Sequence, residues 1–245
     1  MRKTALLLTA IVIIYSTGIT SADTITAPPA AITPGWNMMS IPAVPSSVGT
    51  NPPGFPPDVL DELVGGGTGL DGRLTRWEAS TQSNIGWDST APETMAYFGS
   101  LLLGDGYWLY VDPAATLPIT YSGITSNDSV DMFISLPQAG WNLIGYPYTT
   151  PTPITDYPCF SGTPYAWESV KITDGLTTKS LYDASQYGAG WICSIALWWD
   201  SPHRSSRDLG VTDDYSYSES MIAWHGYWVR SFKDNLGLIL EAPNP

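Results

Sequence analysis

Hydrophobic residues in this chain occur in short runs that alternate with polar positions and end at glycine, proline, asparagine or aspartate. Runs of this length and punctuation predict β-strands joined by turns rather than long helices. Examples are the predicted strands Trp36–Ile41, Tyr107–Val111 and Leu236–Glu241. One short helix is predicted at Asp58–Val64, which follows Pro57 and precedes three consecutive glycines. The pattern therefore predicts an all-β protein with short helices only.

Two sequence motifs each occur twice, which predicts an internal duplication. The first motif sets Gly-Trp-Asn five residues ahead of a proline, at Gly35–Pro42 and again at Gly140–Pro147. The second motif opens with Gly-Tyr-Trp, at Gly106–Val111 and again at Gly226–Ser231. The motifs alternate along the chain, as expected if one unit carrying both motifs was copied.

The spacing of the motifs predicts where the two units differ. The copies of the first motif lie 105 residues apart and those of the second motif 120, so about 15 residues are inserted in the second unit. We expect the insertion within residues 157–192. The chain is predicted to form two similar tandem modules, each a β-sandwich or open barrel, at residues 32–127 and 128–245.

The faces of the motif strands predict which aromatic residues are buried. Both faces of the first motif are apolar, so Trp36 and Trp141 are expected to be buried, while its asparagine hydrogen-bonds a nearby turn. In the second motif, Trp108 and Trp228 share a face that carries Arg230 in the second copy. A long charged side chain favours a partly exposed face. Trp108 and Trp228 are therefore the better candidates for surface aromatic residues.

The N-terminal segment is predicted to direct export. Residues 1–22 resemble a secretory signal peptide, with Arg2 and Lys3 before an apolar run at Ala5–Tyr15, the alternative being an uncleaved anchor. Residues 23–31 form an extended lead that is either a flexible tether or an arm pairing with a neighbouring subunit's sheet edge. Since no later segment is long and apolar enough for a membrane span, the mature chain is expected outside the cell or at its surface.

Charge and composition narrow the classes of partner. The chain has 23 acidic and 10 basic residues and a formal charge of −13. This excess of acid argues against nucleic acid as a partner, because phosphate binding requires lysine and arginine. Eleven tryptophans and fourteen tyrosines supply large side chains for a core, which argues against disorder.

The two cysteines, Cys159 and Cys193, both lie in the second predicted module and bracket most of its insertion. In an oxidising compartment such a pair is expected to form a disulfide. Closing a loop of about 35 residues would stabilise the fold by roughly 3–4 kcal/mol in the chain-entropy treatment. The alternative is a nucleophilic or metal-binding thiol, which no neighbouring histidine or cysteine spacing supports.

Together the two motifs resemble a β-rich module of secreted and cell-surface proteins of bacteria and archaea. In that module the first motif often reads Gly-Trp-Asn-Leu-Ile-Ser-Leu-Pro. The resemblance covers most of the chain, as two modules, although Met38-Met39 and Gly145-Tyr146 depart from the usual residues while keeping the apolar pattern. The resemblance implies an extracellular location and a non-catalytic, structural or binding role, and it carries no catalytic residues to transfer.

The residues support one main expectation and two alternatives for function. Sequence signatures of serine hydrolases, zinc proteases, phosphate-binding loops and dithiol sites are absent, so no enzyme is expected. The main expectation is a secreted structural or adhesive protein of a cell surface or extracellular assembly, filaments included, that associates with itself or with other surface proteins. The first alternative is a carbohydrate-binding protein that stacks sugars on exposed aromatic rings. Its candidate residues are Trp108, Tyr110, Trp228, Trp198 and Trp199.

The second alternative is a glycoside hydrolase, which would need two carboxylates at a defined separation. Glu78 and Glu168 are the candidates, because each follows a tryptophan that could stack on a sugar. No cofactor is expected, with calcium left open, since the protein is acidic and Asp213 and Asp214 are adjacent. The chain has no calcium-binding loop of the EF-hand type.

Overall fold

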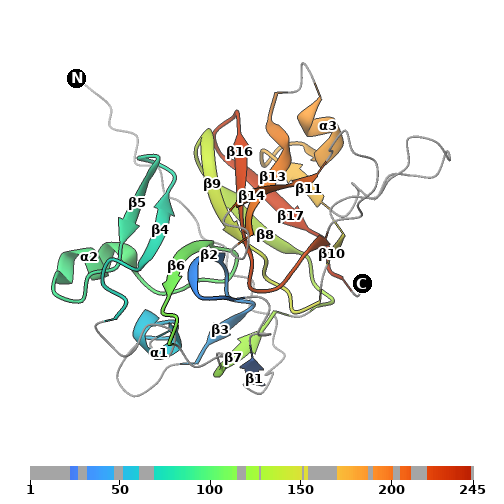
Figure 1. The fold of residues 1–245 in the computed structure, drawn as a ribbon. Coiled ribbons are helices and arrows are strands. Elements are labelled where there is room, and N and C mark those ends of the chain that lie inside the picture. Colours follow the sequence, from blue (N-terminus) through green and yellow to red (C-terminus); the bar gives the residue numbers. More distant parts are fainter. Residues whose placement is uncertain are drawn as a thin grey trace, which may run out of the picture.

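The structure is a computed structural model that describes residues 23–26, 32–46, 52–60, 69–114, 120–126, 128–150, 152–153, 170–186, 190–200, 205–210 and 220–243. Most of the elements formed by these residues are strands, and all their pairings are antiparallel (Figure 1). The helices among them are short. The prediction of an all-β fold with short helices only is confirmed.

The N-terminal half, residues 23–126, contains two sheets in its described part. One has the order β2-β6-β4-β5 and the other β1-β7-β3. The elements are β1 (Asp23–Thr26), β2 (Gly35–Met39), β3 (Ala43–Pro45), α1 (Pro56–Leu60), β4 (Leu74–Glu78), β5 (Ser83–Gly86), α2 (Pro92–Phe98), β6 (Tyr107–Val111) and β7 (Thr120–Thr125).

In its described part, the C-terminal half, residues 128–243, contains two four-stranded sheets, β14-β13-β16-β9 and β12-β11-β17-β8, and the pair β10-β15. Its elements are β8 (Met132–Leu136), β9 (Gly140–Gly145), β10 (Thr152–Pro153), β11 (Val170–Thr173), β12 (Thr178–Ser180), α3 (Leu181–Ser185), β13 (Ile192–Asp200), β14 (Ser205–Gly210), β15 (Ser220–Met221), β16 (Gly226–Ser231) and β17 (Leu236–Leu240).

The sheets that carry the repeated motifs correspond strand by strand. The order β2-β6-β4-β5 in the N-terminal half matches β9-β16-β13-β14 in the C-terminal half. The register also matches, because Trp36 lies opposite Tyr110 and Trp141 lies opposite Arg230. The strand pairing is therefore repeated in the two halves, in agreement with the duplication that the motifs predicted. The division of the chain into two separate modules stays a prediction.

The N-terminal lead forms part of a sheet within its own chain. Strand β1 pairs with β7, with Thr24 opposite Ser122. In the C-terminal half β8 holds the corresponding place, since it precedes the first motif and pairs with the last strand, β17. Residues 23–26 of the lead thus form an edge strand beside β7 of the same chain, and pairing of this segment with a neighbouring subunit stays a prediction.

The described part of the predicted insertion is more than a loop. Strand β11 pairs with β17 on the side away from β8, and β12 extends the sheet by one strand. Val170 and Ile172 are buried in the core of this half, as are Leu181 and Ala184 of α3. The described part of residues 157–192 therefore contributes apolar surface to the core of this half.

The predicted disulfide is not tested by the structure. Cys193 lies in β13 and is half-buried, whereas Cys159 lies outside the described residues. No disulfide joins cysteines within the described ranges, and the Cys159–Cys193 bond stays a prediction.

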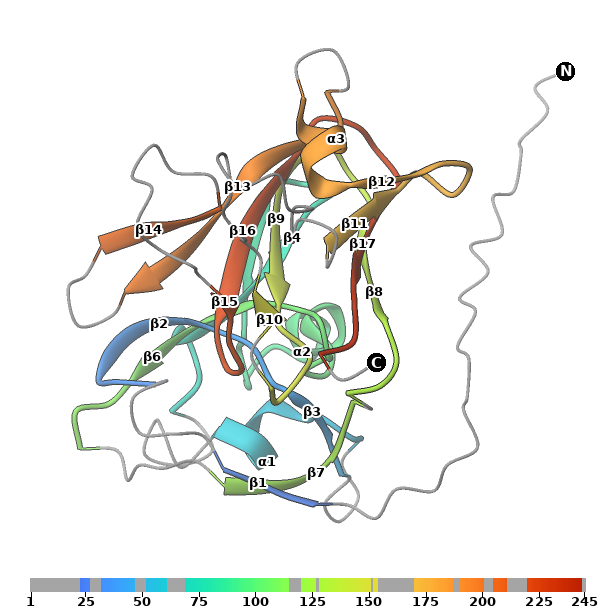
Figure 2. The ribbon, with the colours of Figure 1, turned by 90° about the vertical axis from the view of Figure 1, so that its right-hand side faces the viewer.

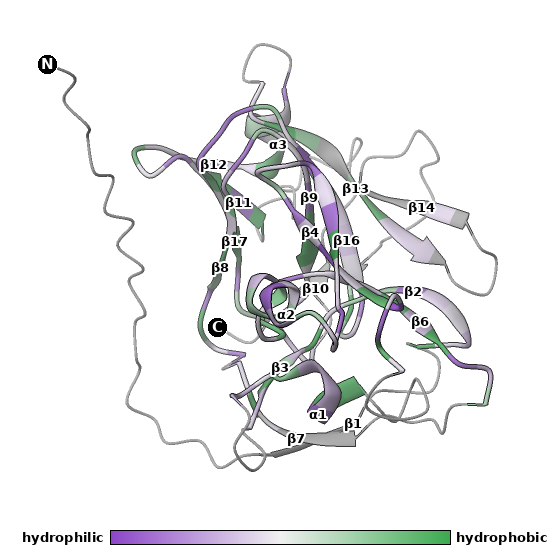
Figure 3. Ribbon diagram, turned by 90° about the vertical axis from the view of Figure 1, so that its left-hand side faces the viewer, coloured by the Kyte–Doolittle hydropathy of each residue, from purple (hydrophilic) through white to green (hydrophobic). Residues whose placement is uncertain are grey.

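Buried apolar side chains form two clusters, one in each half. The first draws on residues 32–111 and also includes Trp224 from the C-terminal half. The second lies within residues 134–240 and includes Leu236, Leu238 and Leu240 of β17. Figure 3 colours the ribbon by hydropathy and labels β17 beside β8 and β11. None of the described helices is long and apolar enough to cross a membrane.

One expectation about the first motif is wrong. Trp36 and Trp141 are 42% and 36% exposed, whereas Asn37, Met38 and Met39 are buried. The tryptophans stand at the start of β2 and β9, where Trp36 lies against Tyr110 and Trp141 against Trp228, with ring centroids 5.5 and 6.2 Å apart. An apolar pattern shows which residues prefer burial but not where a covering layer ends.

Candidate functional site

The two halves meet through backbone pairing between the end of one motif and the start of the other. Met39 pairs with His225, and Ile144 pairs with Asp105. These two bridges are equivalent, because Met39 and Ile144 hold the same place in the first motif and His225 and Asp105 each precede the second. A local pseudo-twofold axis therefore relates the contacts, and we call this region the junction.

Glycines at the junction allow the backbones to approach closely. A Cβ atom at Gly106 would lie 2.7 Å from the carbonyl oxygen of Ile144, and one at Gly226 would lie 2.9 Å from that of Met39. Real Cβ atoms essentially never come this close to a backbone atom. The glycine that opens the second motif is thus required in both copies by the backbone of the opposite half.

Ser40 and Gly145, equivalent residues of the first motif, face each other at this axis. A Cβ at Gly145 would lie 2.6 Å from the Cβ of Ser40, so the space admits one side chain. The Ser40 hydroxyl donates to the His225 carbonyl oxygen at 2.8 Å, and its N–H donates to the Trp224 carbonyl oxygen at 3.0 Å. The difference between Ser40 and Gly145 at this position of the motif therefore has a packing reason.

Each half also packs one of its tryptophans against a second-motif tryptophan of the other half, in the same symmetric way. Trp77 of β4 packs edge-on against Trp228, with centroids 4.8 Å apart, and Trp199 of β13 packs against Trp108 at 5.5 Å. The strand registers make Trp77 and Trp199 equivalent positions. Strand β13 contacts β2 and strand β4 contacts β9, and Figure 2 shows the β13–β14 hairpin reaching out above β2 and β6.

The five aromatic residues named for sugar stacking divide into two places. Trp108, Trp228 and Trp199 meet at the junction, together with Trp198, whose ring lies 5.2 Å from that of His225. Tyr110, on the same face of β6 as Trp108, instead lies against Trp36. All five are half-buried. The prediction that Trp108 and Trp228 are more exposed than Trp36 and Trp141 is wrong, because the opposite half covers the second-motif tryptophans.

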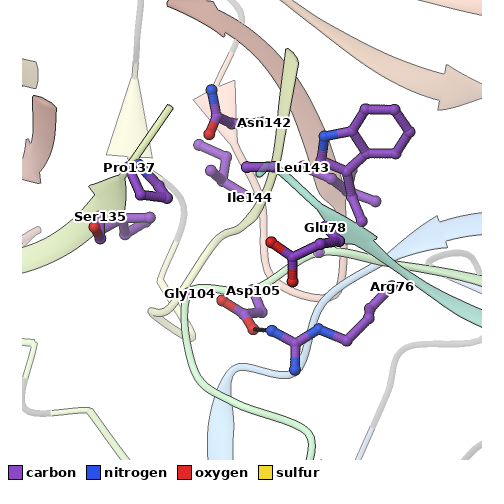
Figure 4. A pocket seen from close by; sticks show the side chains of 13 residues that line it. Arg76, Glu78, Gly104, Asp105, Ser135, Pro137, Asn142, Leu143 and Ile144 are labelled. Atoms are coloured by element: carbon purple, nitrogen blue, oxygen red, sulfur yellow. Dashed lines mark hydrogen bonds and ion pairs between the residues drawn. The ribbon is translucent and has the colours of Figure 1, made fainter. Parts of the chain in front are cut away.

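A cavity of about 200 Å³ lies beside the junction, and both halves line it. The N-terminal half contributes Arg76, Glu78 and Asp105 from β4 and the turn before β6. The C-terminal half contributes β8 and β9, including Ser135 and Asn142. Figure 4 shows the carboxylates of Glu78 and Asp105 on one side of this space, with Ser135 and Pro137 across from them.

The pKa values of the two carboxyls in the cavity are displaced in opposite directions. Burial raises the pKa of Asp105, and the nearby negative charge of Glu78 adds to this rise. Arg76 opposes the rise, since its Nη2 lies 3.2 Å from the Oδ2 of Asp105. For Glu78, hydrogen bonds from the Ser80 hydroxyl and N–H, at 2.7 and 3.1 Å, lower the pKa. The Nη1 of Arg76 also donates to the Phe98 carbonyl oxygen at 2.6 Å.

The motif asparagine differs between the halves at this cavity. Both asparagines hydrogen-bond the preceding turn, as predicted. The Nδ2 of Asn37 donates to the Thr33 carbonyl oxygen at 2.7 Å, and that of Asn142 donates to the Gln138 carbonyl oxygen at 3.3 Å. The Oδ1 of Asn37 accepts the Thr33 N–H at 3.0 Å, whereas no described group donates to the buried Oδ1 of Asn142. Figure 4 shows this oxygen on the cavity side of the amide.

Sequence reasoning found only part of this cavity. Glu78 was a glycosidase candidate, but Glu168, proposed beside it, lies outside the described residues. Arg76 and Asp105 were missed. The available signal was the position of Asp105, which stands in the first copy where His225 stands in the second. The strand registers place Trp198 at the position that Arg76 holds in the N-terminal half. The Arg76–Asp105 ion pair of one half therefore corresponds to the neighbouring rings of Trp198 and His225 in the other.

The structure offers no support for the calcium alternative. No group of three or more His, Cys, Asp or Glu side chains that could hold a metal ion occurs in the part of the chain that is described. Asp213 and Asp214 lie outside that part.

Comparison of the chain with models of protein families, with curated proteins and with solved structures gave no match.

Proposed function

We propose that this chain is a secreted, non-catalytic structural or adhesive protein of a cell surface or extracellular assembly. The observation that carries the proposal is the junction. The repeated motifs place glycines against the backbone of the opposite half and exchange tryptophans with it. Their role in the structure is thus to hold the two halves together as one body. Such a body suits a load-bearing or displaying role better than a role that needs opening and closing.

Free strand edges supply a route to assembly. The outermost strands of each described sheet have one edge that no other described strand covers, as at β5. The residues of β5, Ser-Asn-Ile-Gly, include neither a charged side chain nor a proline. Charged residues and prolines are the usual means by which proteins protect such edges from pairing with other chains. Strand β5 is therefore a candidate seam between subunits.

The two alternative functions gain unequal support. The structure supports sugar stacking on Trp108, Trp228, Trp198 and Trp199 less well than the sequence did, because these rings are half-buried against other rings of the junction. The glycoside hydrolase alternative required two carboxylates that face one cleft, and Glu78 and Asp105 do line one cavity. A direct activity assay is the test of that alternative.

The proposal predicts assembly or surface retention of the exported chain. Residues 23–245 would be purified and followed by light scattering and negative-stain electron microscopy over a range of concentrations, with fractionation of the source cells in parallel. Polymers, or recovery with the cell envelope, are expected. A chain that stays monomeric at every concentration and is recovered only from the culture medium would contradict the proposal.

The role of β1 in assembly is tested separately by cysteine cross-linking. Thr24 and Ser122 are direct partners in the β1–β7 register, so Thr24→Cys with Ser122→Cys should oxidise to a disulfide. The background carries serine at Cys159 and Cys193. Monomers under non-reducing conditions indicate pairing within one chain, and a ladder of covalent multimers indicates exchange of β1 between subunits. Ile25→Cys with Ser122→Cys, which are not opposite each other, is the control.

A further inference from the structure

We propose that the cavity beside the junction binds a single neutral sugar ring through the side chains of Glu78, Asp105 and Asn142. The proposal goes beyond the structural role above, which needs no small ligand. It also concerns residues different from the aromatic rings considered for sugar stacking. Three features of the cavity favour such a ligand, namely its excess of hydrogen-bond acceptors, the unpaired Oδ1 of Asn142, and its charge and size.

The cavity presents more acceptors than donors. Glu78 and Asp105 contribute carboxylate oxygens, and Asn142 contributes its amide oxygen. The main donor nearby is Arg76, whose two terminal nitrogens already donate to the Phe98 carbonyl oxygen and to Asp105. A ligand that complements this set must carry several donors close together, as the hydroxyls of a sugar do.

The amide oxygen of Asn142 gives independent support for a ligand with donors. Asn142 is 4% exposed, and leaving a buried acceptor without a donor is unfavourable. Its equivalent Asn37 avoids this cost by accepting the Thr33 N–H. In the C-terminal half the same atom is instead directed toward the cavity (Figure 4). A hydroxyl bound there would satisfy it.

Charge and size favour a neutral ring. Arg76 offsets one of the two carboxylates and so weakens the attraction for a cation, while the carboxylates disfavour an anion. A volume of about 200 Å³ is below the roughly 300 Å³ at which pockets for drug-sized ligands begin, so the cavity admits one ring rather than a chain. Ile134, Leu143 and Ile144 line the space and offer apolar contact to the C–H face of a sugar.

The test is saturation-transfer NMR on residues 23–245 with methyl glycosides of glucose, mannose and galactose and with N-acetylglucosamine. At least one probe is expected to receive saturation at millimolar concentrations. Glu78→Gln and Asp105→Asn should each weaken binding at least about tenfold, because each removes an acceptor charge from a hydrogen bond. The readout depends on neither assembly nor turnover, so its failure is distinguishable from failure of the structural proposal.

A steric pair of variants separates this cavity from other surfaces. Ser135 is exposed at the cavity wall, so Ser135→Tyr should block entry and remove binding without disturbing the core, whereas Ser135→Ala should retain it. Thr178→Tyr, on exposed β12, is the matched control for an added ring and should also retain binding. Glucosamine tests the competing view of the cavity as a cation site.

Three outcomes would overturn the proposal. The first is the absence of saturation transfer to every probe of the panel. The second is binding that Ser135→Tyr leaves unchanged, because the site would then lie elsewhere. The third is binding of glucosamine with none of the neutral probes, because the ammonium group and not the hydroxyls would then be recognised.

Discussion

Replacing Gly145 with alanine adds one carbon atom where the two halves approach most closely. The new Cβ would lie 2.6 Å from the Cβ of Ser40 and would also meet the carbonyl oxygen of Asp105. Neither atom belongs to the end of a flexible side chain. Ser40 is fully buried and hydrogen-bonded to the His225 carbonyl oxygen, so the halves themselves must separate to make room.

The expected loss of stability follows from these contacts. Overpacking typically costs about 1–3 kcal/mol, and a clash with backbone belongs at the upper end. The bond from the Gly145 N–H to the Gly104 carbonyl oxygen, now 2.8 Å, would be strained, at about 1 kcal/mol. Alanine recovers up to about 1 kcal/mol by restricting the unfolded chain. The free energy of unfolding should therefore fall by about 2–3 kcal/mol.

The assay is guanidinium unfolding followed by circular dichroism, with a thermal melt beside it. For a chain of this size about 1 kcal/mol corresponds to roughly 2–4 °C, so Tm should fall by about 4–12 °C. Gly86→Ala is the matched control, since a Cβ there meets nothing within 4 Å and should change stability by less than about 1 kcal/mol. If Gly145→Ala unfolds at the same denaturant concentration as Gly86→Ala, the halves are not in the contact described.

Three further predictions address the junction, a surface ion pair and turnover. A double-mutant cycle on Trp77 and Trp228, each changed to alanine, should give a coupling of about 1 kcal/mol in unfolding experiments, and zero coupling would mean that the rings do not meet. The hydrogen bond from Lys233 lowers the pKa of Asp174 to about 2, so its stabilising effect should be present above pH 4 and lost as the pH falls toward 2. Asp174→Asn should therefore lower Tm at pH 7 but leave it unchanged at pH 2, and an equal drop at both pH values would point to packing instead. Aryl glycosides should not be hydrolysed at any pH from 4 to 8; hydrolysis that disappears when both cavity carboxylates become amides would contradict the non-catalytic proposal.

The sequence by itself determined the strands and their repetition. Tyr107–Val111 was predicted as a strand and forms β6 with the same bounds, and the predicted strand from Leu236 forms β17. The turn-binding role of Asn37 and Asn142 was also readable, because that side chain bonds its own neighbourhood. These features depend on interactions between residues close in the chain, which a local pattern records.

Only the tertiary structure decided which face of each strand is covered and what the repeated glycines are for. The strand patterns predicted a buried Trp36 and an exposed Trp108, yet Trp36 is exposed and Trp108 is covered by Trp199 from the other half. Gly106 must be a glycine because a Cβ there would collide with the carbonyl oxygen of Ile144. Gly226 must be one because a Cβ there would collide with the carbonyl oxygen of Met39. Such contacts join segments far apart in the chain. Periodicity specifies which side of a strand is apolar, but the layer that covers it is set by how the two halves pack, and so is the cavity formed between them.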